Sequence, residues 1–205
     1  MSSDSRNPKI DFLRMALTLF AISALVAALL GLANYFTAPI IEAAAEKRLN
    51  DSLRSLVATA DHFDAVDEAK YEGNVTVNGT AVPIKAVYNA VNDKGILEGY
   101  CIQVQPMGYS DIIDMIVAID KEGAVSGVQI LSISDTPGVG MKVDSDEKFK
   151  TSVYGLDDTA SIVKTEPKGN EVQVISGATI SSSAYINGVN AALAVADSLD
   201  EEVQQ

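Results

Sequence analysis

The segment with the clearest potential for chemistry is Ser176-Gly177-Ala178-Thr179-Ile180-Ser181, which lies at the start of the last predicted helix. The N-terminus of a helix gathers unpaired backbone N–H groups and partial positive charge, so it is a natural phosphate site. Gly177 and Ala178 are small enough to let a phosphate approach, and the Thr179 hydroxyl could be esterified by it. The simpler interpretation is that Ser176, Thr179 and Ser181 are ordinary N-cap residues.

A second unusual segment is the glycine-rich loop Asp135-Thr136-Pro137-Gly138-Val139-Gly140, which follows a predicted strand. Its glycines allow the backbone to approach a flat or charged group closely, and Pro137 stiffens the turn. Taken alone, the loop also fits an ordinary connection between a sheet and a helix. The sequence contains no dinucleotide-binding glycine fingerprint, P-loop or nucleophile triad, and hence no visible site for NAD.

The elements that position these segments begin with an uncharged stretch from Met15 to Phe36. At 1.5 Å per residue it is long enough to cross a hydrocarbon core of about 30 Å. We therefore expect an uncleaved transmembrane helix. A secretory signal peptide is the alternative, but its apolar region spans only about 7 to 15 residues. Positive residues lie on both sides of this stretch, with Arg6, Lys9 and Arg14 before it and Lys47, Arg48 and Arg54 after it. Because Arg14 adjoins the stretch directly, we expect the N-terminus in the cytoplasm and the bulk of the chain outside.

The expected organisation is a cytoplasmic N-terminus (1–14), a transmembrane helix (15–36), a stalk helix (37–60) and an extracytoplasmic domain (61–205). Pro39 is expected to stop or bend the helix, after which helical spacing resumes. The region 60–73 is predicted to be a loop or a short helix.

The domain itself is predicted to be α+β, with antiparallel hairpins followed by helices. Asn78-Gly79 between β-branched residues is a strong hairpin signal. The stretches 85–105 and 113–133 resemble each other at an offset of 28 residues, with Gly95 and Gly99 aligned to Gly123 and Gly127, and each is predicted to form strand, glycine-containing turn and strand. A duplicated hairpin unit is one interpretation, and a chance similarity of two generic hairpins is the other. Their alternation is typical of a half-buried sheet. A short strand near 172–175 and a helix over 182–201 follow, the latter with Ile186, Val189, Leu193 and Ala196 on one face.

Composition limits the possible functions. A net charge of −13 and a pI near 4.3 argue against nucleic acid and anionic lipid headgroups as partners. Cys101 is the only cysteine, so the chain can form no internal disulfide and no cysteine-ligated iron–sulfur cluster by itself. We expect Cys101 to be buried in a strand and the single histidine, His62, to lie on the surface.

Four features taken together resemble one known family. They are the single-span anchor that ends in Thr37-Ala38-Pro39-Ile40-Ile41, the triplet Gly108-Tyr109-Ser110, the loop from Asp135 to Gly140 and the SGATIS segment that opens the final helix. In order and over nearly the whole chain, they resemble the G subunits of Rnf complexes. Related families are the C subunits of sodium-pumping NADH:quinone oxidoreductases and other FMN-binding domains.

The resemblance implies an FMN bound covalently, through a phosphoester, to Thr179 and installed by a separate flavin transferase. It also implies a role as an electron-transfer subunit of a membrane complex that couples ferredoxin:NAD⁺ oxidoreduction to ion translocation, with the other membrane and iron–sulfur subunits as partners. No catalytic residue and no metal ligand are assigned. The residues implied to surround the cofactor, besides Thr179, are Ser176, Gly177, Ala178, Ser181, Asp135, Thr136, Pro137, Gly138, Gly140, Gly108 and Tyr109.

Two positions depart from the family pattern. Gln173 stands where an Asp commonly precedes the SGAT motif, and Ser134 stands where a His often precedes the acidic residue of the loop. Two other functions are consistent with the sequence. One is the C-type subunit of a sodium-pumping NADH:quinone oxidoreductase, and the other is a membrane-anchored, non-redox interaction domain.

Overall fold

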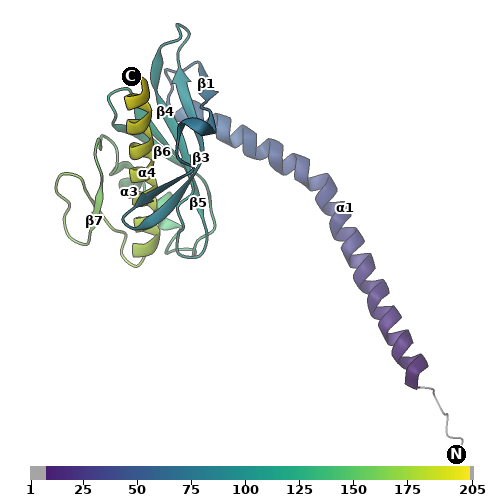
Figure 1. Cartoon of the computed structure of the whole chain (residues 1–205). Coiled ribbons are helices and arrows are strands. Elements are labelled where there is room, and N and C mark those ends of the chain that lie inside the picture. The colour runs from purple at the N-terminus through teal and green to yellow at the C-terminus, as the bar shows by residue number, and fades with distance from the viewer. Residues whose placement is uncertain (1–7, 204–205) are drawn as a thin grey trace, which may run out of the picture. The chain divides into compact units, whose positions relative to one another are not determined.

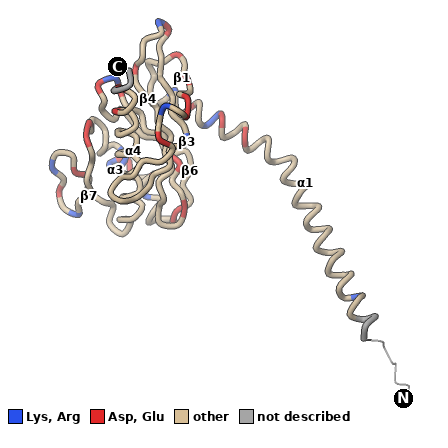
Figure 2. The backbone as a smooth tube through the Cα atoms, viewed as in Figure 1, with Lys and Arg blue, Asp and Glu red and all other residues tan. Residues whose placement is uncertain are grey.

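The computed structural model describes residues 8–203, which form an α+β fold that begins with a long helix (Figure 1). Helix α1 (Pro8–Leu56) has 49 residues and does not stop at Pro39, although proline has no N–H to donate to the carbonyl of Tyr35. Figure 2 shows no Lys, Arg, Asp or Glu along α1 between Arg14 and Glu42. Within the described residues, α1 is the one helix long and apolar enough to cross a membrane.

The chain divides into two units between Lys47 and Arg48, so the last turns of α1 belong to the second unit. That unit contains a six-stranded antiparallel sheet with the order β1-β3-β4-β5-β6, and β2 pairs with β3 as well. The strands are β1 (His62–Ala65), β2 (Asn74–Val77), β3 (Thr80–Val91), β4 (Leu97–Val104), β5 (Ile113–Asp120) and β6 (Val125–Ile133).

The predicted hairpins are confirmed. Asn78-Gly79 joins β2 to β3, with Val77 opposite Thr80. The two stretches that match in sequence form the hairpins β3–β4 and β5–β6. Ala90 lies opposite Gly99 in the first hairpin, Ala118 lies opposite Gly127 in the second, and each register shifts directly after that pair.

Helix α4 (Thr179–Val203) packs on one face of the sheet, and its predicted apolar face is buried there. The prediction of a half-buried sheet is wrong, because the last turns of α1 cover the other face. Leu53 is 1% exposed and packs with Cys101, Ile116 and Ala118, all of which are fully buried. The end of the predicted stalk is therefore part of the domain core.

We expect Leu53→Ala to destabilise the domain strongly, because it would open a cavity beneath the sheet. Buried Leu→Ala substitutions cost about 2–5 kcal/mol. Ile96→Ala is the matched control, since Ile96 is 56% exposed and such surface changes stay within about 0.5 kcal/mol. Chemical denaturation of the purified full chain in detergent measures both variants. Equal stability of the two would contradict the packing of Leu53.

The remaining elements are short. The region 60–73 contains β1, which the sequence did not predict, and a 3₁₀ turn (Glu68–Lys70). After the glycine-rich loop the chain forms two short helices, α2 (Lys142–Ser145) and α3 (Glu147–Thr151). The strand predicted near 172–175 is β8 (Glu171–Gln173), which pairs in parallel with β7 (Ser161–Val163).

Both predictions for single reactive residues are confirmed. His62 is exposed at the start of β1, and Cys101 is fully buried in β4. Burial raises the pKa of the Cys101 thiol to about 12, so it stays protonated and unreactive at neutral pH.

Candidate functional site

Three chain segments that are far apart in sequence meet at the N-terminus of α4. They are the loop between β4 and β5 around Tyr109, the loop after β6 from Asp135 to Gly140, and the turn that leads from β8 into α4. Together they enclose a pocket of about 460 Å³, within the usual range of ligand pockets. Its lining residues are Tyr109, Asp135, Thr136, Val139, Gly140, Gly177, Ala178, Thr179, Ile180 and Ser181.

Within residues 8–203, no side chain caps the N-terminus of α4. Its first helical hydrogen bond is donated by the N–H of Ser182 to the carbonyl of Ala178 at 2.9 Å, so an alanine occupies the capping position. Over the same residues 8–203, the backbone N–H groups of Thr179, Ile180 and Ser181 have no hydrogen-bond acceptor. These donors and the helix dipole form a site for an anion, and Thr179 is exposed at its mouth.

The structure does not support the interpretation of Ser176, Thr179 and Ser181 as N-caps. In the described part of the chain none of the three side chains accepts from a backbone N–H of α4. The Ser181 hydroxyl instead donates to Oδ2 of Asp135 at 2.5 Å. The Ser182 hydroxyl accepts from the N–H of Ile175 at 3.2 Å, which ties the segment after β8 to the first turn of α4.

Asp135 is the residue that joins the three segments. It is 5% exposed, and its carboxylate accepts hydrogen bonds from the Ser181 hydroxyl, from the Thr136 N–H at 2.7 Å and from the Tyr109 N–H at 3.3 Å. Burial alone would raise the pKa of Asp135, but these hydrogen bonds outweigh burial and hold the pKa below its ordinary value. The carboxylate is therefore ionised at neutral pH. The stability it contributes is present above its unfolded pKa and is lost as the pH falls through the folded one.

The loop from Thr136 to Gly140 is shaped to fit against this carboxylate. The Val139 N–H donates to the Thr136 carbonyl at 3.2 Å, with Pro137 and then Gly138 (φ +73°) between them. This is the pattern of a type II turn, which requires a positive φ at its third position. At Gly140 any Cβ would overlap the carboxyl group of Asp135.

The outer wall of the pocket is apolar and exposed. Tyr109 is 66% exposed, Ile180 is 53% exposed and Val139 is 41% exposed, and all three line the pocket. Exposed apolar side chains that surround a pocket are common where a flat organic ligand or a partner is bound.

An FMN-binding domain family model matches residues 108–194, which include all three pocket segments. The G subunit of the Na⁺-translocating ferredoxin:NAD⁺ oxidoreductase complex of Acetobacterium woodii is 29% identical, over 92% of this chain and 93% of that protein. The G subunit of the ion-translocating oxidoreductase complex of Shewanella loihica is 31% identical, over 87% of this chain and 85% of that protein.

The chain belongs to the family of G subunits of ion-translocating oxidoreductase complexes. It is therefore a subunit of a redox complex, and both its α1 helix and its family associate it with a membrane. The crystal structure of NqrC from Shewanella oneidensis matches with a TM-score of 0.50 at 18% identity, over 68% of this chain and 71% of that one, which shows a shared fold.

Eight of the twelve predicted site residues of this G subunit line the pocket. The other four, Gly108, Pro137, Gly138 and Ser176, flank it in sequence. Val139 and Ile180 line the pocket but were not predicted as site residues. The sequence could have indicated both as site residues, since each is a large apolar residue inside a motif of small and polar residues.

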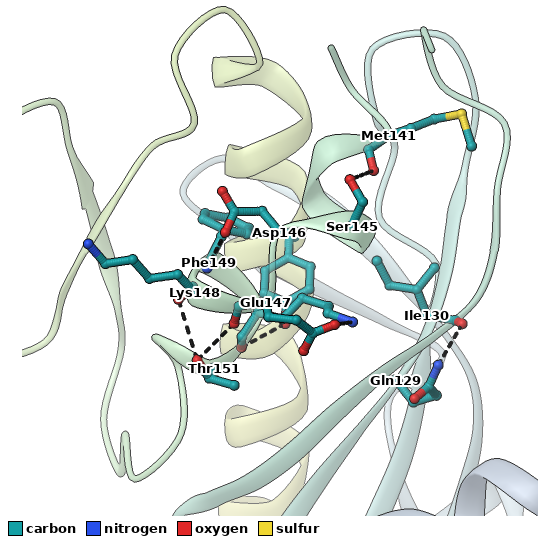
Figure 3. Close-up of polar contacts among 11 residues, drawn as sticks. Gln129, Ile130, Met141, Ser145, Asp146, Glu147, Lys148, Phe149 and Thr151 are labelled. Atoms are coloured by element: carbon teal, nitrogen blue, oxygen red, sulfur yellow. Dashed lines mark hydrogen bonds and ion pairs between the residues drawn. The ribbon is translucent and has the colours of Figure 1, made fainter. Parts of the chain in front are cut away.

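Ser176 lines a second, larger cavity of about 1310 Å³. Gln173 lines this cavity as well, together with residues of α2 and α3, whose polar contacts are drawn in Figure 3. There the carboxylate of Asp146 caps α3 by accepting from the Phe149 N–H at 3.2 Å. Residues 173–176 thus line this second cavity, and residues 177–181 line the first pocket.

Proposed function

We propose that this chain is an electron-transfer subunit that carries FMN bound covalently to Thr179. The observation that carries the proposal is the position of Thr179. Its exposed hydroxyl lies at the uncapped N-terminus of a 25-residue helix and at the mouth of a pocket of suitable size. Membership in the G-subunit family and the match to an FMN-binding domain support the same cofactor.

The residues around Thr179 fit a phosphoester. A phosphate joined to Oγ1 of Thr179 keeps unesterified oxygens that can accept from the free N–H groups of the first turn of α4. Gly177 and Ala178 leave room for its approach. Formation of the ester from FMN and the Thr179 hydroxyl corresponds overall to the loss of one water.

The rest of the pocket fits the flavin ring. Tyr109, Val139 and Ile180 offer apolar contact to a flat ring, while Asp135, Ser181 and Thr136 hold the walls together. A bound flavin supplies one- and two-electron chemistry. The ionised Asp135 is a poor proton donor, so we assign no catalytic acid or base.

The complex that fits this subunit couples ferredoxin:NAD⁺ oxidoreduction to ion translocation. The relatives from Acetobacterium woodii and Clostridium ljungdahlii are named for Na⁺-translocating and proton-translocating complexes of that activity. In this proposal NAD, ferredoxin and the translocated ion bind to other subunits. A flavin transferase attaches the FMN before or during assembly.

We further propose that residues 15–36 span the membrane, that 1–14 lie in the cytoplasm and that the flavin-carrying domain lies outside. Residues 37–60 then join the span to the domain. Proteolysis of intact cells and of inverted vesicles tests this orientation. Cleavage of the domain only in inverted vesicles would contradict it.

The test of the flavin is purification of the full chain from its native host, followed by denaturing gel electrophoresis. We expect a fluorescent band at the position of the chain, because a phosphoester survives SDS whereas noncovalent flavin dissociates. A colourless protein of unmodified mass from a host with a flavin transferase would refute the proposal.

A further inference from the structure

The wall of the pocket contains one fixed negative charge, the carboxylate of Asp135. In the described part of the chain, no Lys, Arg or His lies within ion-pair distance of it. It accepts from neutral donors: the Ser181 hydroxyl and the backbone N–H groups of Thr136, Tyr109 and Ser110. Such hydrogen bonds fix the position of the charge without cancelling it. Because Asp135 is 5% exposed, water and salt screen the charge only weakly.

We propose that Asp135 lowers the reduction potential of the flavin by holding this negative charge beside it. The inference rests on the proposed attachment of FMN at Thr179. Two-electron reduction of a flavin with uptake of one proton leaves one more negative charge on it, and the electrons come from a neighbouring redox centre of the complex. Like charges near a protein surface repel each other more strongly than they do in bulk water, so Asp135 disfavours reduction.

Asp135 also acts against the field of α4. The N-terminus of a helix carries a partial positive charge of roughly half an elementary charge, which by itself would favour a reduced, more negative flavin. The bond of 2.5 Å from the Ser181 hydroxyl holds the carboxylate against the first turn of α4. The helix can therefore bind a phosphate while the carboxylate offsets its effect on the ring.

The hydrogen bonds of Asp135 make this a positioning role as well as an electrostatic one. The same carboxylate connects the β4–β5 loop, the loop after β6 and α4. Substitutions must therefore separate the loss of charge from the loosening of the pocket. Asp135→Asn removes the charge and keeps the size of the side chain. Ser181→Ala removes a donor and keeps the charge.

The experiment is a reductive titration of the flavin-loaded full chain with dithionite and a reference dye. We expect Asp135→Asn to raise the equilibrium constant for two-electron reduction at least tenfold, which is an upward shift of about 30 mV. Asp135→Glu, which restores the charge, should return the potential close to that of the wild type. Glu122→Gln is the matched control for net charge, since Glu122 lies beyond the far end of β5, about 25 Å away along the strand. It should leave the potential unchanged.

Ser181→Ala distinguishes the two possible causes of a shifted potential, namely loss of the Asp135 charge and loosening of the pocket. If the charge sets the potential, this variant leaves the potential unchanged or lowers it, because the carboxylate loses a donor that partly offsets it. An upward shift in both Ser181→Ala and Asp135→Asn would assign the effect to loosening and overturn the proposal. An unshifted Asp135→Asn would overturn it as well.

A second pair of variants leaves the Asp135 carboxylate and its hydrogen bond from Ser181 in place. Thr136 is exposed at the pocket, so Thr136→Lys adds a positive charge near Asp135, and Thr136→Gln is its neutral control. We expect a higher potential for Thr136→Lys than for Thr136→Gln. This pair decides the question if Asp135→Asn does not take up flavin, and equal potentials would then overturn the proposal. A wild-type chain without flavin would refute the proposed function itself, whereas a loaded chain with unshifted variants refutes only this inference.

Discussion

Thr179→Ala is expected to abolish the covalent flavin completely. Alanine has no hydroxyl to carry the phosphoester, and the other hydroxyls of the segment are unsuited to replace it. The Ser181 hydroxyl is buried and donates to Asp135, and Ser176 lies at the second cavity. In-gel flavin fluorescence after denaturation should fall to background for this variant.

Three other variants make this prediction specific. Thr179→Ser keeps a hydroxyl at the same backbone position and should retain flavin, while Ser176→Ala and Ser181→Ala should remain fluorescent. Circular dichroism should show that Thr179→Ala is folded, because Thr179 is exposed and only its carbonyl is hydrogen-bonded, to Ser183, within the described residues. Covalent fluorescence that persists in Thr179→Ala, or disappears in Ser181→Ala with the fold intact, would contradict the assignment.

Gly140→Ala is expected to damage the site through packing. A Cβ at this position would overlap the buried carboxyl group of Asp135, and overpacking of this kind costs about 1–3 kcal/mol. For a domain of this size, each kcal/mol lowers the Tm by about 2–4 °C. Flavin loading should fall as well, because the same carboxylate organises the pocket. Thermal unfolding and the absorbance ratio of flavin to protein measure the two effects.

Gly73→Ala is the matched control, since nothing lies within 4 Å of a Cβ there. A double-mutant cycle identifies the collision partner. In an Asp135→Ala background the group that clashes is gone, so Gly140→Ala should cost clearly less than in the wild type. An equal cost in both backgrounds would show that the carboxyl group is not what excludes a side chain at Gly140.

Much of the fold could be predicted from local sequence patterns. Asn78-Gly79 specifies its hairpin through turn chemistry, and the apolar face of α4 follows from its period of 3.6 residues. The position of Thr179 at a strand-to-helix turn follows from the same patterns. These features depend on residues that are close together in the chain.

The parts that could not be predicted depend on contacts between distant segments. The sequence shows Leu53 on an apolar helix face but does not show that this face covers a sheet, because the stalk continues an already apolar span. Strand β1 has four residues, too few for a periodic signal. It exists because its backbone pairs with β3.

Prediction of the site from the sequence was limited in the same way. The sequence draws attention to the loop after β6 and to the SGATIS segment, but it does not show that Asp135 accepts from Ser181, which is 46 positions later. Nor does it show that Ala178 rather than a serine occupies the capping position. Both facts follow from the packing of α4, and they turn two separate motifs into one pocket.

The most direct test of covalent attachment is tandem mass spectrometry of the chain purified from its native host. The proposal predicts that the proteolytic peptide containing Thr179 is heavier by one FMN less one water and that fragmentation places the addition on Thr179. An unmodified peptide from a host with an active flavin transferase, or a flavin on any other residue, would contradict it.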